Sequence, residues 1–128
     1  MNKVRVLLVD DETGFTTIVK INLEKTGDYE VAVENDSLNA VSTAKKFQPD
    51  IVFLDMVMPG MDGGDVRRLM QESPELCDIP VIFLTALVSH SDVNPEAGLT
   101  VVGDDIMLPK PIKMETLMSC INQVLTKQ

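Results

Sequence analysis

The chain has 128 residues, which suits one domain with its own apolar core, and its formal net charge is −9. No basic run is present, so the composition argues against a nucleic-acid-binding surface. Cys77 and Cys120 lack the spacing of metal or redox motifs, which indicates reduced structural thiols. There is no signal-peptide pattern and no apolar run long enough for a membrane span. We therefore expect a cytoplasmic protein that binds no membrane.

The first half of the chain predicts two strands and two helices. The strands are an apolar run at Val4–Val9 and an alternating run at Tyr29–Val33. We expect Thr13 to cap the first helix. We expect Asp36, or the serine that follows it, to cap the second.

The second half continues the same alternation. The pattern predicts strands at Asp50–Asp55 and Val81–Leu84, with a last strand somewhere within Val101–Leu108. A helix is expected over Gly63–Ser73, ending before a proline. The final helix is the clearest, because its apolar residues keep one stripe from Met114 to Leu125.

Strands that alternate with helices, each strand nearly continuous in apolar residues, predict a parallel sheet covered on both faces. Right-handed connections then give a doubly wound α/β fold. The sequence has no linker or internal repeat, so we expect one domain over residues 1–128. In such sheets ligands bind at the carboxyl ends of the strands, where we therefore look for chemistry.

Polar residues follow the predicted strands at this edge: Asp10, Asp11, Asp55, Thr85 and Lys110. Three carboxylates in close contact repel one another, and a hard divalent cation bound by oxygens relieves that repulsion. Mg²⁺ suits an open crevice because it keeps several waters. With the cation and the lysine neutralising a phosphoryl group, Asp55 is a candidate nucleophile that forms an acyl phosphate.

Four short motifs occur in order along the chain and carry a family resemblance: VDDE at 9–12, LDMVMPGMDG at 54–63, LTA at 84–86 and LPKP at 108–111. Together they resemble the receiver domain of bacterial two-component response regulators. The resemblance implies a flavodoxin-like, five-stranded parallel sheet of order 2-1-3-4-5. It also implies a signalling switch that takes a phosphoryl group from a histidine kinase or a phosphotransfer protein, with Mg²⁺ bound.

The resemblance also implies a role for each matching residue. Asp55 corresponds to the phosphoacceptor. Asp10 and Asp11 correspond to the acidic pair that binds the metal together with Asp55, and the backbone carbonyl of Val57 corresponds to a further metal ligand.

Three more site residues follow from the same motifs. Thr85 resembles the switch hydroxyl that contacts the phosphoryl group, and the small Ala86 keeps the approach to the acceptor open. Lys110 resembles the lysine that pairs with the acceptor and then with the phosphate. Beyond the kinase, the resemblance allows an output domain or a second copy of the chain as partner. It implies no nucleic-acid contact by this domain.

Two features depart from the family pattern. Met107 stands where receivers usually carry an aromatic residue on the fifth strand, so the usual threonine–aromatic coupling is not expected. Residues 87–105 are longer than is common and have poor helical periodicity, interrupted by Pro95 and Gly98. We expect the fourth helix to be short, displaced or replaced, and residues 99–102 (LTVV) to be extended.

Two alternatives remain open. A pseudo-receiver would bind partners without phosphorylation. A phosphatase of the haloacid dehalogenase type also uses a strand-end aspartate and Mg²⁺, but it needs a second acid two residues later, where this chain has Val57. We therefore expect no metabolic enzyme, only self-catalysed phosphorylation and dephosphorylation.

Overall fold

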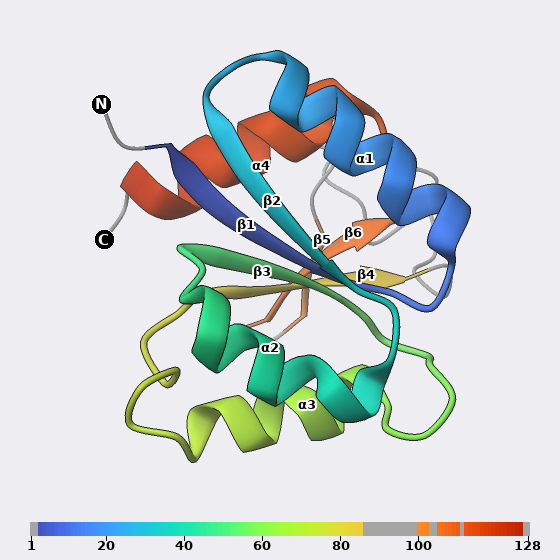
Figure 1. Ribbon diagram of the computed structural model, residues 1–128, viewed down its shortest axis with the longest axis vertical. Coiled ribbons are helices and arrows are strands. Elements are labelled where there is room, and N and C mark those ends of the chain that lie inside the picture. Colours follow the sequence, from blue (N-terminus) through green and yellow to red (C-terminus); the bar gives the residue numbers. More distant parts are fainter. Residues whose placement is uncertain (1–2, 86–99, 103–104, 111, 127–128) are drawn as a thin grey trace.

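The computed structural model describes residues 3–85, 100–102, 105–110 and 112–126. Six strands form one sheet of order β2-β1-β3-β4-β6-β5 (Figure 1). Neighbouring strands from β2 to β6 pair in parallel, and β5 pairs antiparallel with β6 at one edge. The bounds of the strands are β1 Val4–Val9, β2 Tyr29–Glu34, β3 Ile51–Asp55, β4 Val81–Thr85, β5 Thr100–Val102 and β6 Asp105–Pro109.

The parallel part of the sheet confirms the predicted order 2-1-3-4-5, with β6 as the fifth parallel strand. The last strand expected within Val101–Leu108 is present as β6, and a further short strand, β5, pairs antiparallel with it. Residues 100–102 are extended, as their composition predicts. The expectation of an altered fourth helix covers residues 87–105; residues 87–99 and 103–104 of this range lie outside the described residues, so it stays a prediction.

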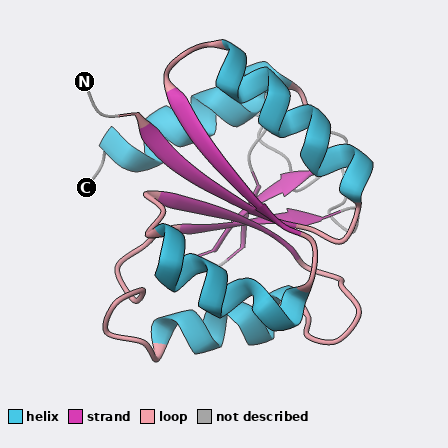
Figure 2. Cartoon of the chain, viewed as in Figure 1, coloured by secondary structure: helices cyan, strands magenta, loops and turns pink. Residues whose placement is uncertain are grey.

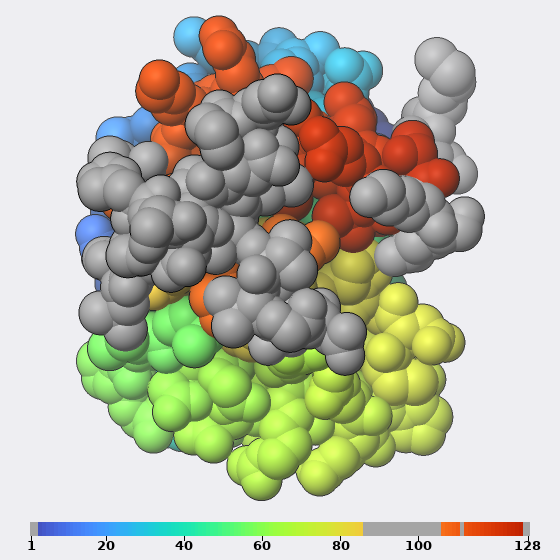
Figure 3. Space-filling view, turned by 180° about the vertical axis from the view of Figure 1, so that it is seen from behind, coloured from blue at the N-terminus to red at the C-terminus, as the bar shows by residue number. Residues whose placement is uncertain are grey.

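Among the described residues, four α-helices cover the two faces of the sheet, α1 and α4 on one side and α2 and α3 on the other (Figures 1 and 2). From behind, α4 lies above α3 and the segment that leads into β4 (Figure 3). No helix in the described part of the chain is long and apolar enough to cross a membrane. The bounds of the helices are α1 Thr13–Lys25, α2 Ala40–Phe47, α3 Gly63–Gln71 and α4 Met114–Thr126.

The helix starts test the predicted caps. Asp36 caps as expected, since its Oδ1 accepts from Leu38 N at 3.0 Å, but it begins a short 3₁₀ turn that leads into α2. The prediction for Thr13 is wrong. Glu12 occupies the N-cap position of α1 and Thr13 is the first helical residue. Asp10 explains the difference, because its Oδ1 accepts from Glu12 N at 2.9 Å and forms the turn into α1.

The two central strands contribute to both apolar layers because successive side chains point to opposite faces. On β3, Ile51 and Phe53 pack with α1 and α4, while Val52 and Leu54 pack on the side of α2 and α3. All four side chains are fully buried. This two-sided burial is why the strand is apolar at every position up to Asp55.

Backbone hydrogen bonds extend the sheet one residue beyond the ends of β1, β3 and β6. Asp10 N donates to Glu34 O at 3.1 Å, Met56 N to Leu84 O at 3.0 Å and Lys110 N to Thr85 O at 3.0 Å. Because the parallel strands end at the same edge, these bonds fix the backbone on which the candidate site is built.

Candidate functional site

Asp10 stands at the end of β1 and is completely buried. Its Oδ2 lies 2.6 Å from Lys110 Nζ. The approach departs from hydrogen-bonding geometry, so among the described residues Oδ2 has a charged neighbour but no aligned hydrogen-bond donor. A buried carboxylate is costly unless a positive charge lies against it, so this oxygen favours a positive neighbour, and in this structure Lys110 supplies that charge.

Asp55 ends β3 and is 7% exposed. Its Oδ1 accepts from Val57 N at a long 3.3 Å, and its Oδ2 lies 3.6 Å from Lys110 Nζ. Burial raises the pKa of Asp55, and the nearby charge of Asp10 raises it further, more than Lys110 and the Val57 N–H lower it. Asp55 is thus an acid at the rim of the core whose charge is only partly compensated.

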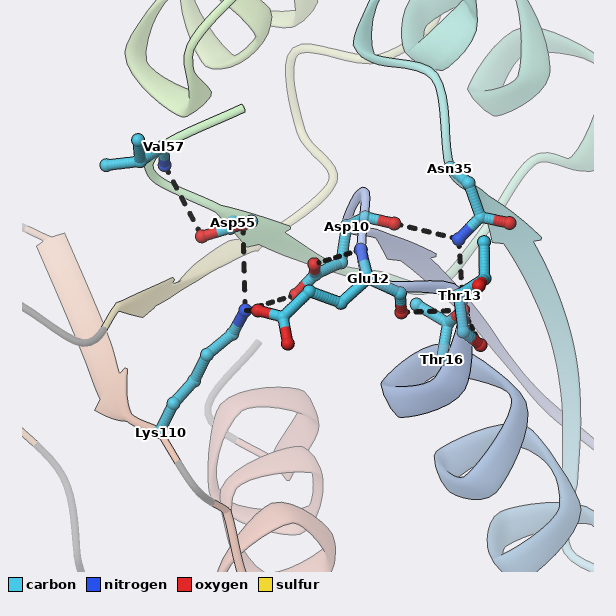
Figure 4. A network of polar contacts seen from close by, with 8 residues as sticks. All are labelled: Asp10, Glu12, Thr13, Thr16, Asn35, Asp55, Val57 and Lys110. Carbon is cyan, nitrogen blue, oxygen red and sulfur yellow. Dashed lines mark hydrogen bonds and ion pairs between the residues drawn. The ribbon is translucent and has the colours of Figure 1, made fainter. Parts of the chain in front are cut away.

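Lys110 follows β6 and reaches into the carboxylates with a side chain only 14% exposed (Figure 4). Its Nζ lies 2.6 Å from Asp10 Oδ2, 3.0 Å from Glu12 Oε1 and 3.6 Å from Asp55 Oδ2. It also lies 5.0 Å from the centre of the Phe15 ring. Burial lowers the pKa of Lys110, but the Asp10 and Glu12 carboxylates, with the charge of Asp55, outweigh burial and raise it overall.

Asp10, Asp11 and Asp55 form an acidic cluster in which one ligand atom of each lies within 4.8 Å of the others. Asp10 and Asp55 are buried and Asp11 is exposed, so the cluster opens to solvent on one side. Its ligand atoms are all carboxylate oxygens, which hard divalent cations prefer. The cluster therefore fits a metal ion.

The other predicted site residues have different outcomes. Thr85 is buried at the end of β4, and its carbonyl accepts from Lys110 N. The Val57 side chain is 63% exposed at the rim, while its N–H faces Asp55. Ala86 lies outside the described residues. Met107 is partly buried, and it packs with the apolar layer under α2 and α3.

Sequence reasoning missed the second role of Glu12. The residue is the N-cap of α1, and it also pairs with Lys110 across 98 positions of sequence. The run of three acids at residues 10–12 was the available signal. A contact between two long side chains so far apart in sequence depends on the folded geometry.

Asn35 is a second residue that sequence reasoning missed. Its Nδ2 donates to the backbone carbonyl of Asp10 at 2.8 Å and to Thr16 Oγ1 at 3.0 Å. Thr16 is fully buried and its hydroxyl also donates back to Thr13 O at 3.2 Å. Asn35 thus joins the end of β2 to the end of β1 and to the first turn of α1 (Figure 4). Its position at the carboxyl end of a predicted strand was a usable signal.

A pocket of about 280 Å³ lies away from this cluster, at the opposite end of β4. It is lined by residues of α3, by the segment before β4 and by single residues of β6 and α4. None of the candidate site residues lines it, so the acidic cluster at the carboxyl edge remains the candidate functional site.

Comparison with known proteins finds a matching family and curated relatives at 34–37% identity. Residues 6–122 match the response regulator receiver domain family. The transcriptional regulatory protein TrcR of Mycobacterium tuberculosis is 37% identical over 124 residues, which cover 97% of this chain and 46% of TrcR. The response regulator MprA of Mycobacterium leprae is 34% identical over 123 residues, covering 96% of this chain and 51% of MprA. The chain spans about half the length of these curated relatives.

Solved structures agree with the fold. The chemotaxis response regulator CheY4 of Vibrio cholerae superposes with a TM-score of 0.80 at 28% identity, covering 97% of this chain and all of CheY4. A response regulator from Desulfuromonas acetoxidans has a TM-score of 0.76 at 23% identity, with 97% and 98% covered, and supports the fold alone. The matched family consists of receiver domains and is not an enzyme family. The sheet order, the acidic cluster and the match over nearly the whole chain lead to one conclusion: this chain belongs to the response regulator receiver domain family.

Proposed function

We propose that the chain is a phosphorylation-dependent signalling switch in which Asp55 accepts a phosphoryl group from a histidine kinase or a phosphotransfer protein. The observation that carries this proposal is the position of Asp55. Its carboxylate lies at the open carboxyl edge, in an acidic cluster with Asp10 and Asp11, and 3.6 Å from the Lys110 ammonium. We also propose that residues 1–128 are a single receiver domain of a cytoplasmic protein.

The proposed cofactor is Mg²⁺, held by the carboxylates of Asp10, Asp11 and Asp55 and by the backbone carbonyl of Val57. When bound, it would supply positive charge to the oxygens of an incoming phosphoryl group. The protein itself supplies the arrangement of oxygens: Asp10 and Asp55 are buried, Asp11 is exposed to solvent, and one carboxylate oxygen of each lies within 4.8 Å of the others.

The proposed chemistry is a simple displacement. A carboxylate oxygen of Asp55 attacks phosphorus and forms an O–P bond, while the P–N bond of a phosphohistidine donor breaks and its electron pair returns to the imidazole. Lys110 and the Thr85 hydroxyl would then contact the phosphoryl oxygens, and the small Ala86 would leave room for the donor. The product carries more negative charge than the carboxylate, which is the local event that a switch requires.

The proposed output is a change in partner binding, not turnover of a metabolite. TrcR is described as a transcriptional regulatory protein, and the part of TrcR that matches this chain is 46% of its length. By analogy, an output domain or a second copy of the chain is the proposed partner besides the kinase. We propose no nucleic-acid contact by this domain itself, because its net charge of −9 would repel phosphates.

The test is incubation with Mg²⁺ and acetyl phosphate, followed by intact mass measurement. We expect a gain of one phosphoryl group that Asp55→Asn abolishes. Asp62→Asn is a matched control in the same loop, because asparagine keeps the capping ability of Asp62, whose Oδ1 accepts from Asp65 N at 2.9 Å. A gain that survives Asp55→Asn refutes the proposal, and no gain in the unaltered protein favours a pseudo-receiver.

A further inference from the structure

The Lys110 ammonium is shared among more carboxylates than its proposed role requires. It contacts Asp10 at 2.6 Å and Glu12 at 3.0 Å, both closer than Asp55 at 3.6 Å. The start of α1 thus contacts the ammonium twice. Glu12 forms an ion pair with it, and the centre of the Phe15 ring lies 5.0 Å from it.

Glu12 differs from the other two carboxylates in its freedom. Its side chain is 63% exposed, whereas those of Asp10 and Asp55 are 0% and 9% exposed. Its side chain makes no cap hydrogen bond to α1. It also lies outside the acidic cluster that fits a metal ion. Its clear contact is therefore the one with Lys110, and substitution should leave the helix start intact.

A conflict arises when a cation occupies the acidic cluster. Asp10 Oδ2 is the closest carboxylate oxygen to Lys110, and Asp10 is also one of the two buried carboxylates of the acidic cluster. If Asp10 and Asp55 turn to the cation, the ammonium of a lysine only 14% exposed loses two of its three carboxylate partners. A buried charge without a partner is costly, so the exchange needs a carboxylate that stays behind.

We propose that Glu12 is a positioning residue that keeps Lys110 in place while Asp10 and Asp55 exchange the ammonium for a divalent cation. This inference rests on the proposed metal-dependent function and adds a residue to it. Glu12 supports cation binding because it remains a carboxylate partner for the ammonium when Asp10 and Asp55 turn to the cation. It also leaves Lys110 within reach of a phosphoryl group on Asp55.

Two substitutions separate this role from a general effect of charge. Glu12→Gln removes both the charge and the ion pair. Glu12→Asp keeps the charge but withdraws the carboxylate by one methylene, about 1.5 Å, from an ammonium that it now contacts at 3.0 Å. An effect of charge alone would spare Glu12→Asp, whereas the proposed contact would not survive it.

The first measurement is the Mg²⁺ affinity of the full chain, from NMR titration of the Val57 amide. We expect both variants to bind Mg²⁺ about two- to fivefold more weakly, the range for a partly exposed ion pair. The second is hydrogen exchange at the Lys110 ammonium with Mg²⁺ bound. With Mg²⁺ bound, we expect hydrogen exchange at the Lys110 ammonium to be slow in the unaltered protein and fast in both variants.

Wild-type affinity in Glu12→Asp, or ammonium exchange that is equally fast in all three proteins with Mg²⁺, overturns the role of Glu12. So does a chain that binds no Mg²⁺. These results are distinct from failure of the proposed function. If Asp55 accepts no phosphoryl group while both measurements turn out as expected, the switch fails and the role of Glu12 stands.

Discussion

The two acidic loops of the site, after β1 and after β3, differ in the contacts around their buried aspartates. The loop after β1 is held by side chains: Asp10 forms the turn to Glu12, Asn35 binds the Asp10 carbonyl, and Lys110 lies on the buried carboxylate. Next to Asp55, the loop after β3 is held by backbone, through Met56 N to Leu84 O and Gly63 N to Met56 O, both at 3.0 Å. Farther from Asp55, the Ser37 hydroxyl donates to Pro59 O and accepts from Met61 N.

This difference separates two tasks within one cluster. Many contacts hold Asp10, as suits a residue that must present a fixed oxygen to a cation. Asp55 has a long contact with Val57 and a distant lysine, and its pKa is raised chiefly by burial. A nucleophile needs an oxygen that is not already engaged, so the sparse loop is the one suited to react. The predictions below test whether side chains hold the loop after β1 and backbone hydrogen bonds hold the loop after β3.

The largest effect is expected for Gly63→Ala, in the loop held by backbone. A Cβ at this position would lie 2.5 Å from the Asp55 carbonyl oxygen and 3.0 Å from the Met56 Cα, and neither atom can move without shifting β3. We expect a loss of about 2–4 kcal/mol in unfolding free energy, measured by urea denaturation.

Gly14→Ala is the matched control for this prediction. Gly14 lies in the first turn of α1, where an added Cβ meets nothing within 4 Å. Alanine there should stabilise the chain by roughly 0.5–1 kcal/mol through helix propensity. Equal effects of the two substitutions would show that the tight backbone approach at Gly63 does not hold the β3 loop.

The next effect is expected for Asn35→Ala, in the loop held by side chains. The substitution removes two hydrogen bonds, and it leaves the Asp10 carbonyl without this donor. We expect a loss of about 1.5–3 kcal/mol by urea denaturation. The control is Asn39→Ala, an exposed asparagine whose side chain makes no cap bond, with a change within about 0.5 kcal/mol. Similar values for both would remove Asn35 from the support of Asp10.

Mg²⁺ should stabilise the folded chain by binding the carboxylates of the acidic cluster. Because these carboxylates come from both loops, the stabilisation should depend on both. At ten times its dissociation constant, a cation that binds only the folded state adds about 1.4 kcal/mol to the unfolding free energy. Chelation should abolish this gain, and Asp55→Asn or Asp10→Asn should each reduce it, as thermal unfolding with and without Mg²⁺ would measure. An undiminished gain in both variants would place the cation elsewhere.

The sequence was sufficient where the fold repeats a simple pattern. The apolar runs of β1 and β3 predicted a parallel sheet, and parallel strands necessarily bring their ends together. That is why Asp10, Asp55 and Lys110, far apart in sequence, were expected at one edge and are found there. Topology alone gave this part of the site.

The sequence was insufficient where side-chain geometry decides. The pattern of residues 99–102 predicted extended backbone, but three paired residues carry no information on partner or direction, and β5 proved antiparallel to β6. In the same way, Glu12 pairs with Lys110 and Asn35 with the Asp10 carbonyl through rotamers that the fold selects. Such contacts become visible only once the strand ends are placed.

The smallest effect expected is a pH-dependent gain in stability from Asp55→Asn. Burial and the charge of Asp10 raise the pKa of Asp55 in the folded chain. The folded chain therefore binds the proton of the Asp55 carboxyl group more tightly than the unfolded chain does. The ionised Asp55 carboxylate therefore lowers the unfolding free energy by its full amount at pH values above the pKa of the folded chain. This loss is relieved as the pH falls through that pKa. The asparagine variant should be more stable than the unaltered protein at pH 7, by less than Asn35→Ala loses. The difference in stability between the two proteins should narrow toward pH 4, as urea midpoints would measure.

The control is Asp78→Asn, at an exposed position, which should show no such trend. If the asparagine variant is instead less stable at pH 7, the charge of Asp55 is as well compensated as that of Asp10. The contrast between a fixed oxygen and a reactive one then fails.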